Sequence, residues 1–265
     1  MEESTTTDTV NKTAARRRKG KIYEPGSKDP YELSRSKVNL FLECQRCFWL
    51  DRRYGIAPPP GLPHSLNLAV DELLKREFDT FRATSEIHPL LKRYGLLLRP
   101  AQRPELNLWR NNFKGVRVFD QGTNLILYGS IDDLWIDDLC TYYVADYKAT
   151  SKKGEPGLDA DWQISYKRQV EFYQWLLRKN GLSVSDQAWF VYANGEKHRP
   201  IFEDTLHFAT SLISYKGNTD WVEPTLDKIV RILNEPQAPA ADAVCQVCAF
   251  VEHANNTTRI RDGAD

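Results

Sequence analysis

The apolar residues of this chain follow helical spacing in its first third and strand spacing in its middle. Residues 34–54 carry an apolar stripe between Ser34 or Ser36, either of which suits the start of a helix, and Gly55, which suits its end. Prolines at positions 58–60 then interrupt the pattern. A second helix is predicted for residues 65–82, where one face collects Leu66, Val70, Leu73, Leu74 and Phe78.

Strand-like segments follow in close order, at residues 114–120, 125–136 and 141–150. The polar joints between them are short enough for hairpins, so we expect an antiparallel meander. The pattern ends with a helix over 159–180, a strand over 187–194, a strand near 205–213 and a helix near 220–234. The order of helix, three strands, helix and strand predicts an α/β fold, in which helices flank a mixed β-sheet.

Composition and charge narrow the class of protein. The 265 residues suffice for one substantial core, and 36 basic residues balance 36 acidic ones. Because the chain has no net charge, any binding to nucleic acid or to a membrane has to depend on a local patch of charge. No apolar run reaches the roughly 18 residues of a membrane span, and the N-terminus lacks an apolar signal. These features predict a soluble, cytoplasmic protein with no membrane partner.

Domain limits follow from the same contrast between polar and apolar segments. Residues 1–28 are polar and rich in Thr, so we expect a disordered extension. Its basic run, Arg16–Lys21, suits either solvation or contacts with phosphates. A folded domain is predicted for residues 29–255 and a flexible tail for residues 256–265.

Asp132, Asp146 and Lys148 are the first candidates for chemistry. Strand alternation places Asp132 on one face with Leu134 and Ile136. A carboxylate on an apolar face needs a partner such as a metal ion, a lysine or a hydrogen-bond network. In a hairpin, Asp132 comes close to Asp146 and Lys148 at one end of the sheet. Two carboxylates and one cation suit Mg²⁺ or Mn²⁺ and phosphodiester hydrolysis, although an ordinary polar strand end is the alternative.

The motifs "GSID", "DYK" and "QVEFY", in this order, resemble the PD-(D/E)XK nuclease superfamily. Within that superfamily the chain is similar to RecB-like exonucleases, which include a CRISPR-associated branch. The resemblance covers roughly residues 33–250 and implies a restriction-endonuclease-like fold with an α-β-β-β-α-β core. It also implies that Asp132 and Asp146 bind Mg²⁺ or Mn²⁺ and that Lys148 handles the attacking water.

Further site residues are implied by the same resemblance. Gln169 and Tyr173 lie one helical turn apart and would line the site, although an ordinary amphipathic helix explains them as well. The backbone carbonyl of Tyr147 would be a metal ligand. Relatives often carry a histidine ligand on the helix before the sheet. In those relatives the histidine lies four residues after a glycine, and this chain has Asn67 and Asp71 at that spacing. Asp71 is either a third carboxylate ligand or a solvated helix residue.

Two CxxC motifs form a second group of candidate ligands. "CQRC" contains Cys44 and Cys47, and "CQVC" contains Cys245 and Cys248. The two-residue gap lets both thiolates of a motif reach one metal, and two motifs complete a four-thiolate site. Free buried thiols or a redox pair are the alternative.

Zn²⁺ and a [4Fe-4S] cluster both accept four cysteines. The resemblance favours the iron–sulfur cluster, which in such nucleases joins the regions before and after the core, with Zn²⁺ as the alternative. Those relatives have one cysteine upstream and three downstream, whereas this chain has two and two. His253 is a remote alternative ligand, and we expect Cys140 to be an ordinary buried thiol.

The sequence therefore predicts a metal-dependent nuclease of the RecB-like exonuclease type that acts on single- or double-stranded DNA. The resemblance also suggests protein partners in DNA repair, recombination or CRISPR adaptation. A catalytically inactive nucleic-acid-binding or scaffold protein of the same fold is the alternative, and an iron–sulfur electron carrier is a third possibility. Local positive charge near the site suits DNA phosphates or a solvated face and comes from Lys152, Lys153, Lys167 and Arg168.

Overall fold

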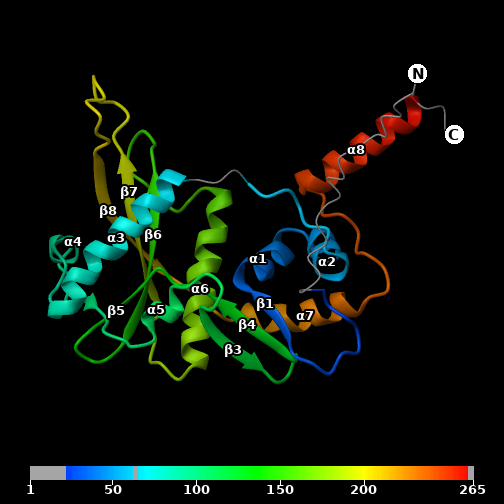
Figure 1. Ribbon diagram of the computed structural model, residues 1–265, viewed down its shortest axis with the longest axis horizontal. Helices are drawn as coiled ribbons and strands as arrows, with labels where there is room; N and C mark the ends of the chain where they lie inside the picture. Colours follow the sequence, from blue (N-terminus) through cyan, green and yellow to red (C-terminus); the bar gives the residue numbers. More distant parts are fainter. Residues whose placement is uncertain (1–21, 62–64, 262–265) are drawn as a thin grey trace, which may run out of the picture.

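Two mixed β-sheets flanked by helices form the centre of the protein, as a computed structural model of residues 22–61 and 65–261 describes it (Figure 1). The smaller sheet has the order β1 (Tyr31–Ser34), β4 (Leu125–Gly129), β3 (Val116–Asp120). The larger sheet has the order β2 (Arg99–Pro100), β5 (Asp133–Ile136), β6 (Tyr142–Thr150), β7 (Gln187–Gly195), β8 (Phe208–Lys216). The predicted α/β class is confirmed, and the arrangement is consistent with a restriction-endonuclease-like fold.

Strand β6 lies at the centre of the larger sheet. It pairs antiparallel with β5, where Asp133 faces Ala145, and parallel with β7, where Asp146 faces Phe190. A parallel pair needs a crossover connection, and helix α6 (Ile164–Lys179) provides it between β6 and β7. Because β5 begins only at Asp133, the C-terminal half of β6 extends beyond its neighbour on that side.

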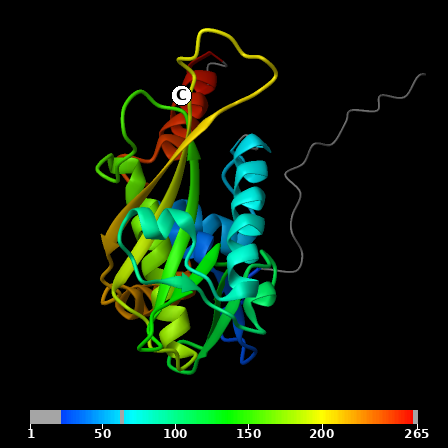
Figure 2. The same ribbon diagram turned by 90° about the vertical axis from the view of Figure 1, so that its left-hand side faces the viewer.

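Helices cover both faces of the larger sheet (Figures 1 and 2). Helix α3 (Ser65–Thr84) packs Val70, Leu74 and Phe78 against one face, which carries Trp135 and Tyr147. Helix α6 packs against the opposite face, whose residues include Leu134, Val144 and Phe190. Alternation along β5 is thus as predicted. The face predicted for α3 is partly wrong, because Leu66 and Leu73 are exposed.

The predicted helix over residues 34–54 is divided into two. Helix α1 (Arg35–Glu43) ends at Cys44, whose backbone is extended with φ −161° and ψ 110°, and α2 (Gln45–Tyr54) begins after it. Helix α7 (Val222–Asn234) packs against α2, and α8 (Gln246–Arg261) extends away from the body (Figure 1). The segment after α3 holds two short helices, α4 (Pro89–Arg93) and α5 (Leu106–Trp109).

The predicted meander is wrong because its middle strand is two strands in different sheets. Strand β4 ends at Gly129 and β5 begins at Asp133. Between them the Ile131 amide donates to the carbonyl of Trp109, 3.1 Å away, and Ser130 Oγ bonds Asn112 Oδ1 at 2.9 Å. These bonds to the α5 region draw the chain out of the first sheet. The four-residue β1, parallel to β4, was not predicted.

The predicted extension falls largely outside the described residues, and the predicted tail falls partly outside them. Within the described part, Tyr23 donates its amide to the Arg52 carbonyl at 2.7 Å and packs its ring edge-on against Tyr31. Helix α8 continues to Arg261. The division into extension, domain and tail stays a prediction. Among the described helices, none has the length and apolar character needed to cross a membrane.

Candidate active site and cysteine centre

Asp132, Asp146 and Lys148 meet where β6 extends past β5. Asp146 and Lys148 alternate with Tyr147 along β6 and therefore point toward α6. Asp132 directly precedes β5, and its Oδ2 accepts a hydrogen bond from the Tyr147 amide at 3.1 Å. The Lys148 ammonium forms an ion pair with the Asp146 carboxylate. The structure therefore brings together the three residues that the motifs singled out.

A second lysine joins this group from the opposite face of the sheet. Lys75 Nζ lies 2.7 Å from Asp71 Oδ2 and 3.2 Å from Asp132 Oδ1. Asp71 is thus linked to the motif residues through Lys75. Three carboxylates and two ammonium groups therefore share the site. The sequence signal for Lys75 was its position one turn after Asp71, a spacing that places both side chains on one helix face.

Burial and neighbouring charges divide the two motif carboxylates. Asp146 is fully buried, and burial raises its pKa to about 7, with the Asp132 charge adding to the effect of burial and Lys148 opposing it. Burial also disfavours the charge on Asp132, but Lys75, Lys148 and the Tyr147 amide outweigh it and lower the pKa of Asp132. When two carboxylates share a site, their pKa values commonly diverge in this way.

The carboxylates fit a hard divalent cation. Oδ1 of Asp146 is buried and accepts no hydrogen bond from the described residues, although a buried carboxylate oxygen needs a partner. Carboxylate oxygens are the ligands that Mg²⁺ and Mn²⁺ prefer. The N–H and C=O of a strand residue point to the same edge, so the Tyr147 carbonyl faces the edge where its amide meets Asp132.

Gln169 and Tyr173 line the site from α6. Gln169 Nε2 donates to the Tyr173 hydroxyl at 3.2 Å, and the Tyr173 ring is buried. Burial raises the pKa of Tyr173, so its hydroxyl keeps its proton. A Cβ added at Gly129 would lie 2.8 Å from Cε1 of Tyr173. The glycine of "GSID" is therefore required because the Tyr173 ring packs directly on that backbone.

Asp133 differs completely from its neighbour Asp132. Its carboxylate is fully buried, forms ion pairs with Arg82 and Arg110, and accepts a hydrogen bond from the Tyr147 hydroxyl at 2.6 Å. Trp135 Nε1 also donates to it, at 3.2 Å. These bonds hold β5, β6 and α3 together beneath the site. Sequence alternation gave the face of Asp133 but not these partners, which come from α3 and from the segment after α5.

The four motif cysteines converge on one point. Their sulfurs all lie within 4.8 Å of one another, and three of the pairs are separated by 3.5 to 3.7 Å. Four Zn–S bonds of about 2.3 Å in a tetrahedron require sulfurs about 3.8 Å apart. The spacing in this centre therefore matches a single tetrahedral ion. The centre does not include His253, and Cys140 is exposed rather than buried as predicted.

Each cysteine pair stands at the start of a helix. Cys44 is the N-cap of α2, and its sulfur accepts a hydrogen bond from the Cys47 amide at 3.5 Å. Cys245 directly precedes α8 in the same way. Burial opposes the ionisation of Cys44, but hydrogen bonds from backbone amides, including that of Cys47, outweigh it and lower its pKa to about 7. Burial instead raises the pKa of Cys47 and raises that of Cys248 to about 11, so the start of α2 favours the metal-binding thiolate form at Cys44 and not at these two.

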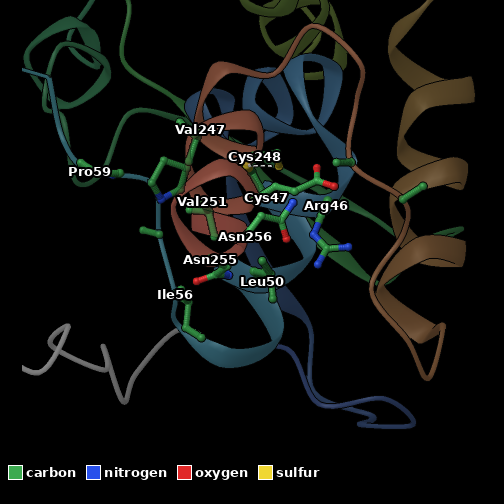
Figure 3. Close-up of a pocket in the computed structure, with 15 residues that line it drawn as sticks. Arg46, Cys47, Leu50, Ile56, Pro59, Val247, Cys248, Val251, Asn255 and Asn256 are labelled. Carbon is green, nitrogen blue, oxygen red and sulfur yellow. Dashed lines mark hydrogen bonds between the residues drawn. The ribbon is translucent and has the colours of Figure 1, made fainter. Parts of the chain in front are cut away.

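A cavity of about 660 Å³ adjoins the cysteine centre between α2 and α8. Figure 3 shows Cys47 and Cys248 at one end of it, with Leu50 from α2 and Val251 from α8 along its wall. Its lining is mainly apolar. The cysteine centre thus joins α8 to α2 beside this cavity.

Comparisons with known proteins agree with the site geometry. A family model described as the PD-(D/E)XK nuclease superfamily matches residues 32–252. The matched span contains the three carboxylates, both site lysines and all four clustered cysteines. A comparison with curated proteins gave no match. On the strength of that match over most of its length, this chain belongs to the PD-(D/E)XK nuclease superfamily.

Proposed function

We propose that this protein is a metal-dependent nuclease that hydrolyses phosphodiester bonds in DNA, in the manner of RecB-like exonucleases. Membership of the superfamily indicates nuclease activity on a nucleic acid. The observation that supports catalysis in this chain is the convergence of Asp132, Asp146 and Lys148 around a buried carboxylate oxygen to which no described residue donates a hydrogen bond. We further propose that it acts in the cytoplasm with partners in repair, recombination or CRISPR adaptation.

Asp132, Asp146 and the Tyr147 carbonyl would hold Mg²⁺ or Mn²⁺, with Asp71 as a further carboxylate. A bound divalent cation supplies Lewis-acid activation of water and neutralises charge on the phosphate. Asp132 is the side chain best suited to keep its negative charge, since Lys75, Lys148 and the Tyr147 amide lower its pKa. Asp146 must lose its proton before it can bind a cation.

Lys148 provides a fixed positive charge at the site. Burial disfavours the ammonium, but Asp146 and Asp132 outweigh that effect and raise its pKa, so it stays protonated at neutral pH. Its Nζ lies 4.5 Å from the centroid of the Tyr166 ring, a position that orients it. In this role Lys148 donates hydrogen bonds to the attacking water or to the phosphate, and stabilises the charge that develops in the transition state.

Gln169 and Tyr173 act as donors beside the carboxylates. The Tyr173 hydroxyl keeps its proton, and Gln169 donates to its oxygen, which leaves the hydroxyl hydrogen free to face the substrate. These groups bind and orient the phosphate-bearing strand. Their contribution is positioning, which lowers the barrier by holding water and phosphate in a reactive geometry.

Cleavage of labelled DNA tests this function directly. Purified protein is incubated with single-stranded and double-stranded DNA, with and without Mn²⁺, beside Asp146→Ala and Lys148→Ala. We expect Mn²⁺-dependent cleavage by the unaltered protein and loss of it in both variants. Equal cleavage by all three proteins would refute the assignment of the site.

A second candidate function is a nucleic-acid-binding or scaffold protein of the same fold without catalysis. Lys75 favours it, because its ammonium neutralises Asp71 and Asp132 where a catalytic cation would bind. Binding of DNA by a protein that never cleaves it, whichever divalent cation is supplied, would support this candidate over the nuclease.

For the cysteine centre we propose a structural metal site. The resemblance to RecB-like nucleases favours a [4Fe-4S] cluster, but sulfur separations of 3.5 to 3.7 Å favour a single Zn²⁺. A cubane cluster attaches each cysteine to a different iron and so needs sulfurs farther apart. Anaerobically purified protein should be colourless and contain one equivalent of zinc. Broad absorption near 400 nm with bound iron would instead establish the cluster.

A further inference from the structure

An exposed indole stands beside the proposed active site. Trp162 is 62% exposed and occupies the short helical turn Asp161–Gln163 that precedes α6. Its ring meets the edge of Tyr166 at a centroid distance of 5.3 Å and an angle of 84°. The Tyr166 ring in turn lies 4.5 Å from Nζ of Lys148. An aromatic pair therefore leads from the proposed catalytic lysine to the solvent.

The turn that presents Trp162 is held firmly from below. Gln163 is buried, and its Nε2 donates to the carbonyl of Gly157 at 2.5 Å and to the Tyr192 hydroxyl at 3.2 Å. Its Oε1 accepts the amide of Ala160 at 3.0 Å. Tyr192 faces Lys148 across the parallel pair of β6 and β7. The exposure of Trp162 is thus built into the fold, since the residue next to it anchors the turn to the sheet that carries the site.

The surrounding charges indicate what kind of group Trp162 can receive. Lys152 and Lys153 begin the connection between β6 and α6, but the same connection carries Glu155, Asp159 and Asp161. Mixed charge of this kind does not draw a phosphate to the indole itself. An uncharged, flat group suits it, and base–aromatic stacking tolerates any base because every base has a π-face.

We propose that Trp162, supported by Tyr166, is a stacking platform for an unpaired nucleobase of the strand whose phosphate lies at Lys148. This inference rests on the proposed nuclease function and specifies its substrate. In a duplex both faces of each base are covered by its neighbours, so the platform takes a single strand or a frayed end. Trp162 is then a positioning residue that acts through the substrate strand and not through the metal ligands.

Binding measurements with and without bases test the platform. Fluorescence anisotropy compares a labelled oligothymidylate with an abasic oligomer of equal length and charge, with Ca²⁺ in place of Mn²⁺. Base–aromatic stacking contributes about 1–3 kcal/mol, so Trp162→Ala should weaken thymidylate binding by roughly five- to 150-fold and leave abasic binding unchanged. Trp162→Phe should retain most of the affinity, because it keeps an aromatic face, and also covers the case in which the alanine variant misfolds.

Phe119→Ala is the matched control, since it removes a half-exposed aromatic side chain from β3, a strand of the smaller sheet. It should leave both affinities unchanged. The platform is overturned if Trp162→Ala binds thymidylate as the unaltered protein does, or if it loses affinity for both oligomers equally. Mn²⁺-dependent cleavage, with Asp146→Asn as its negative control, is measured separately. Failure of cleavage would thus refute the nuclease while the binding result still decides the platform.

Discussion

The cysteine centre and the carboxylate site differ in how their ligands are arranged. The four sulfurs are alike, lie within 4.8 Å of one another and stand at two helix starts, so they enclose a single point. The carboxylates of Asp71, Asp132 and Asp146 come from three elements and are interleaved with two lysines. The cysteine centre leaves no position for a substrate. In the carboxylate site, two lysine ammonium groups occupy positions from which a metal ion or a substrate can displace them.

This difference separates a structural role from a chemical one. Structural metal sites are closed by protein ligands, while catalytic sites keep a position for water or substrate. The cysteine centre joins α2 to α8, so a metal bound there would contribute to folding. The carboxylate site instead keeps a buried oxygen of Asp146 that accepts no hydrogen bond within the described part of the chain, which costs stability and is retained where binding needs it. Substitutions in the two regions should therefore change different properties.

The largest expected effect comes from the neighbours Asp132 and Asp133. Asp132→Asn should lower Mn²⁺-dependent cleavage on the order of a thousandfold, because several kcal/mol of charge stabilisation are lost, and should lower the unfolding free energy less than Asp133→Asn does. Asp133→Asn should lower the unfolding free energy by about 3 kcal/mol, because Arg82 and Arg110 would lose their buried partner. Paired cleavage assays and urea unfolding check this, and similar profiles for the two variants would contradict it.

Substitution of a clustered cysteine should lower the stability of the fold. Cys47→Ser should release the metal and lower the unfolding free energy by several kcal/mol, since metal binding energy is folding energy in such sites. Cys140→Ser is the control, because Cys140 is exposed and lies outside the centre. Metal analysis and thermal unfolding measure both. The structural role would be wrong if Cys47→Ser removed the metal and left the unfolding temperature unchanged.

The same contrast explains what the sequence could predict. The cysteine centre was predictable because the spacing of a CxxC motif lets both of its thiolates reach one metal, whatever the fold of the remaining chain. The convergence of Asp132, Asp146 and Lys148 was predictable because hairpin pairing brings them to one end of the sheet and their motifs resemble the PD-(D/E)XK superfamily. Asp132 and Asp133 look alike in sequence, but their roles depend on partners from other segments. Lys75 pairs with Asp132, whereas Arg82 and Arg110 pair with Asp133.

The elements that sequence missed share one cause. The break between β4 and β5 depends on hydrogen bonds of Ser130 and Ile131 to the α5 region, and no local pattern signals such bonds. Helix 34–54 divides at Cys44, where an apolar stripe continues across the break. Long-range contacts override local preference at these points, and both lie next to candidate sites.

A smaller effect is expected from pH at the carboxylate site. Burial raises the pKa of Asp146 to about 7, so a cation has to displace a proton below that pH. Mn²⁺ affinity should therefore rise up to about tenfold per pH unit as pH increases toward 7, and level off above it. In metal-free protein the unfolding free energy changes in the opposite direction and falls as pH rises. The reason is that the folded state holds the proton of Asp146 more tightly than the unfolded chain does. This group's contribution to stability is present below pH 4 and is lost as pH rises through 7.

Calorimetric titration of Mn²⁺ at several pH values, together with metal-free unfolding curves, measures both signs. Asp146→Asn is the control, since it cannot titrate and should remove the pH dependence of the unfolding free energy that this group causes. A flat affinity between pH 6 and 8 in the unaltered protein would contradict the raised pKa of Asp146.

The smallest expected effect tests whether Lys75 competes with the cation. Its ammonium pairs with both Asp71 and Asp132, so a metal ion binding these carboxylates has to displace it. Lys75→Met should therefore tighten Mn²⁺ binding by about fivefold, equivalent to about 1 kcal/mol for a partly exposed pair. Arg76→Met, next on the same helix and paired only with Glu72 among the described contacts, should leave the affinity unchanged. Weaker binding in Lys75→Met would mean that Lys75 instead holds the two carboxylates in the geometry that the cation needs.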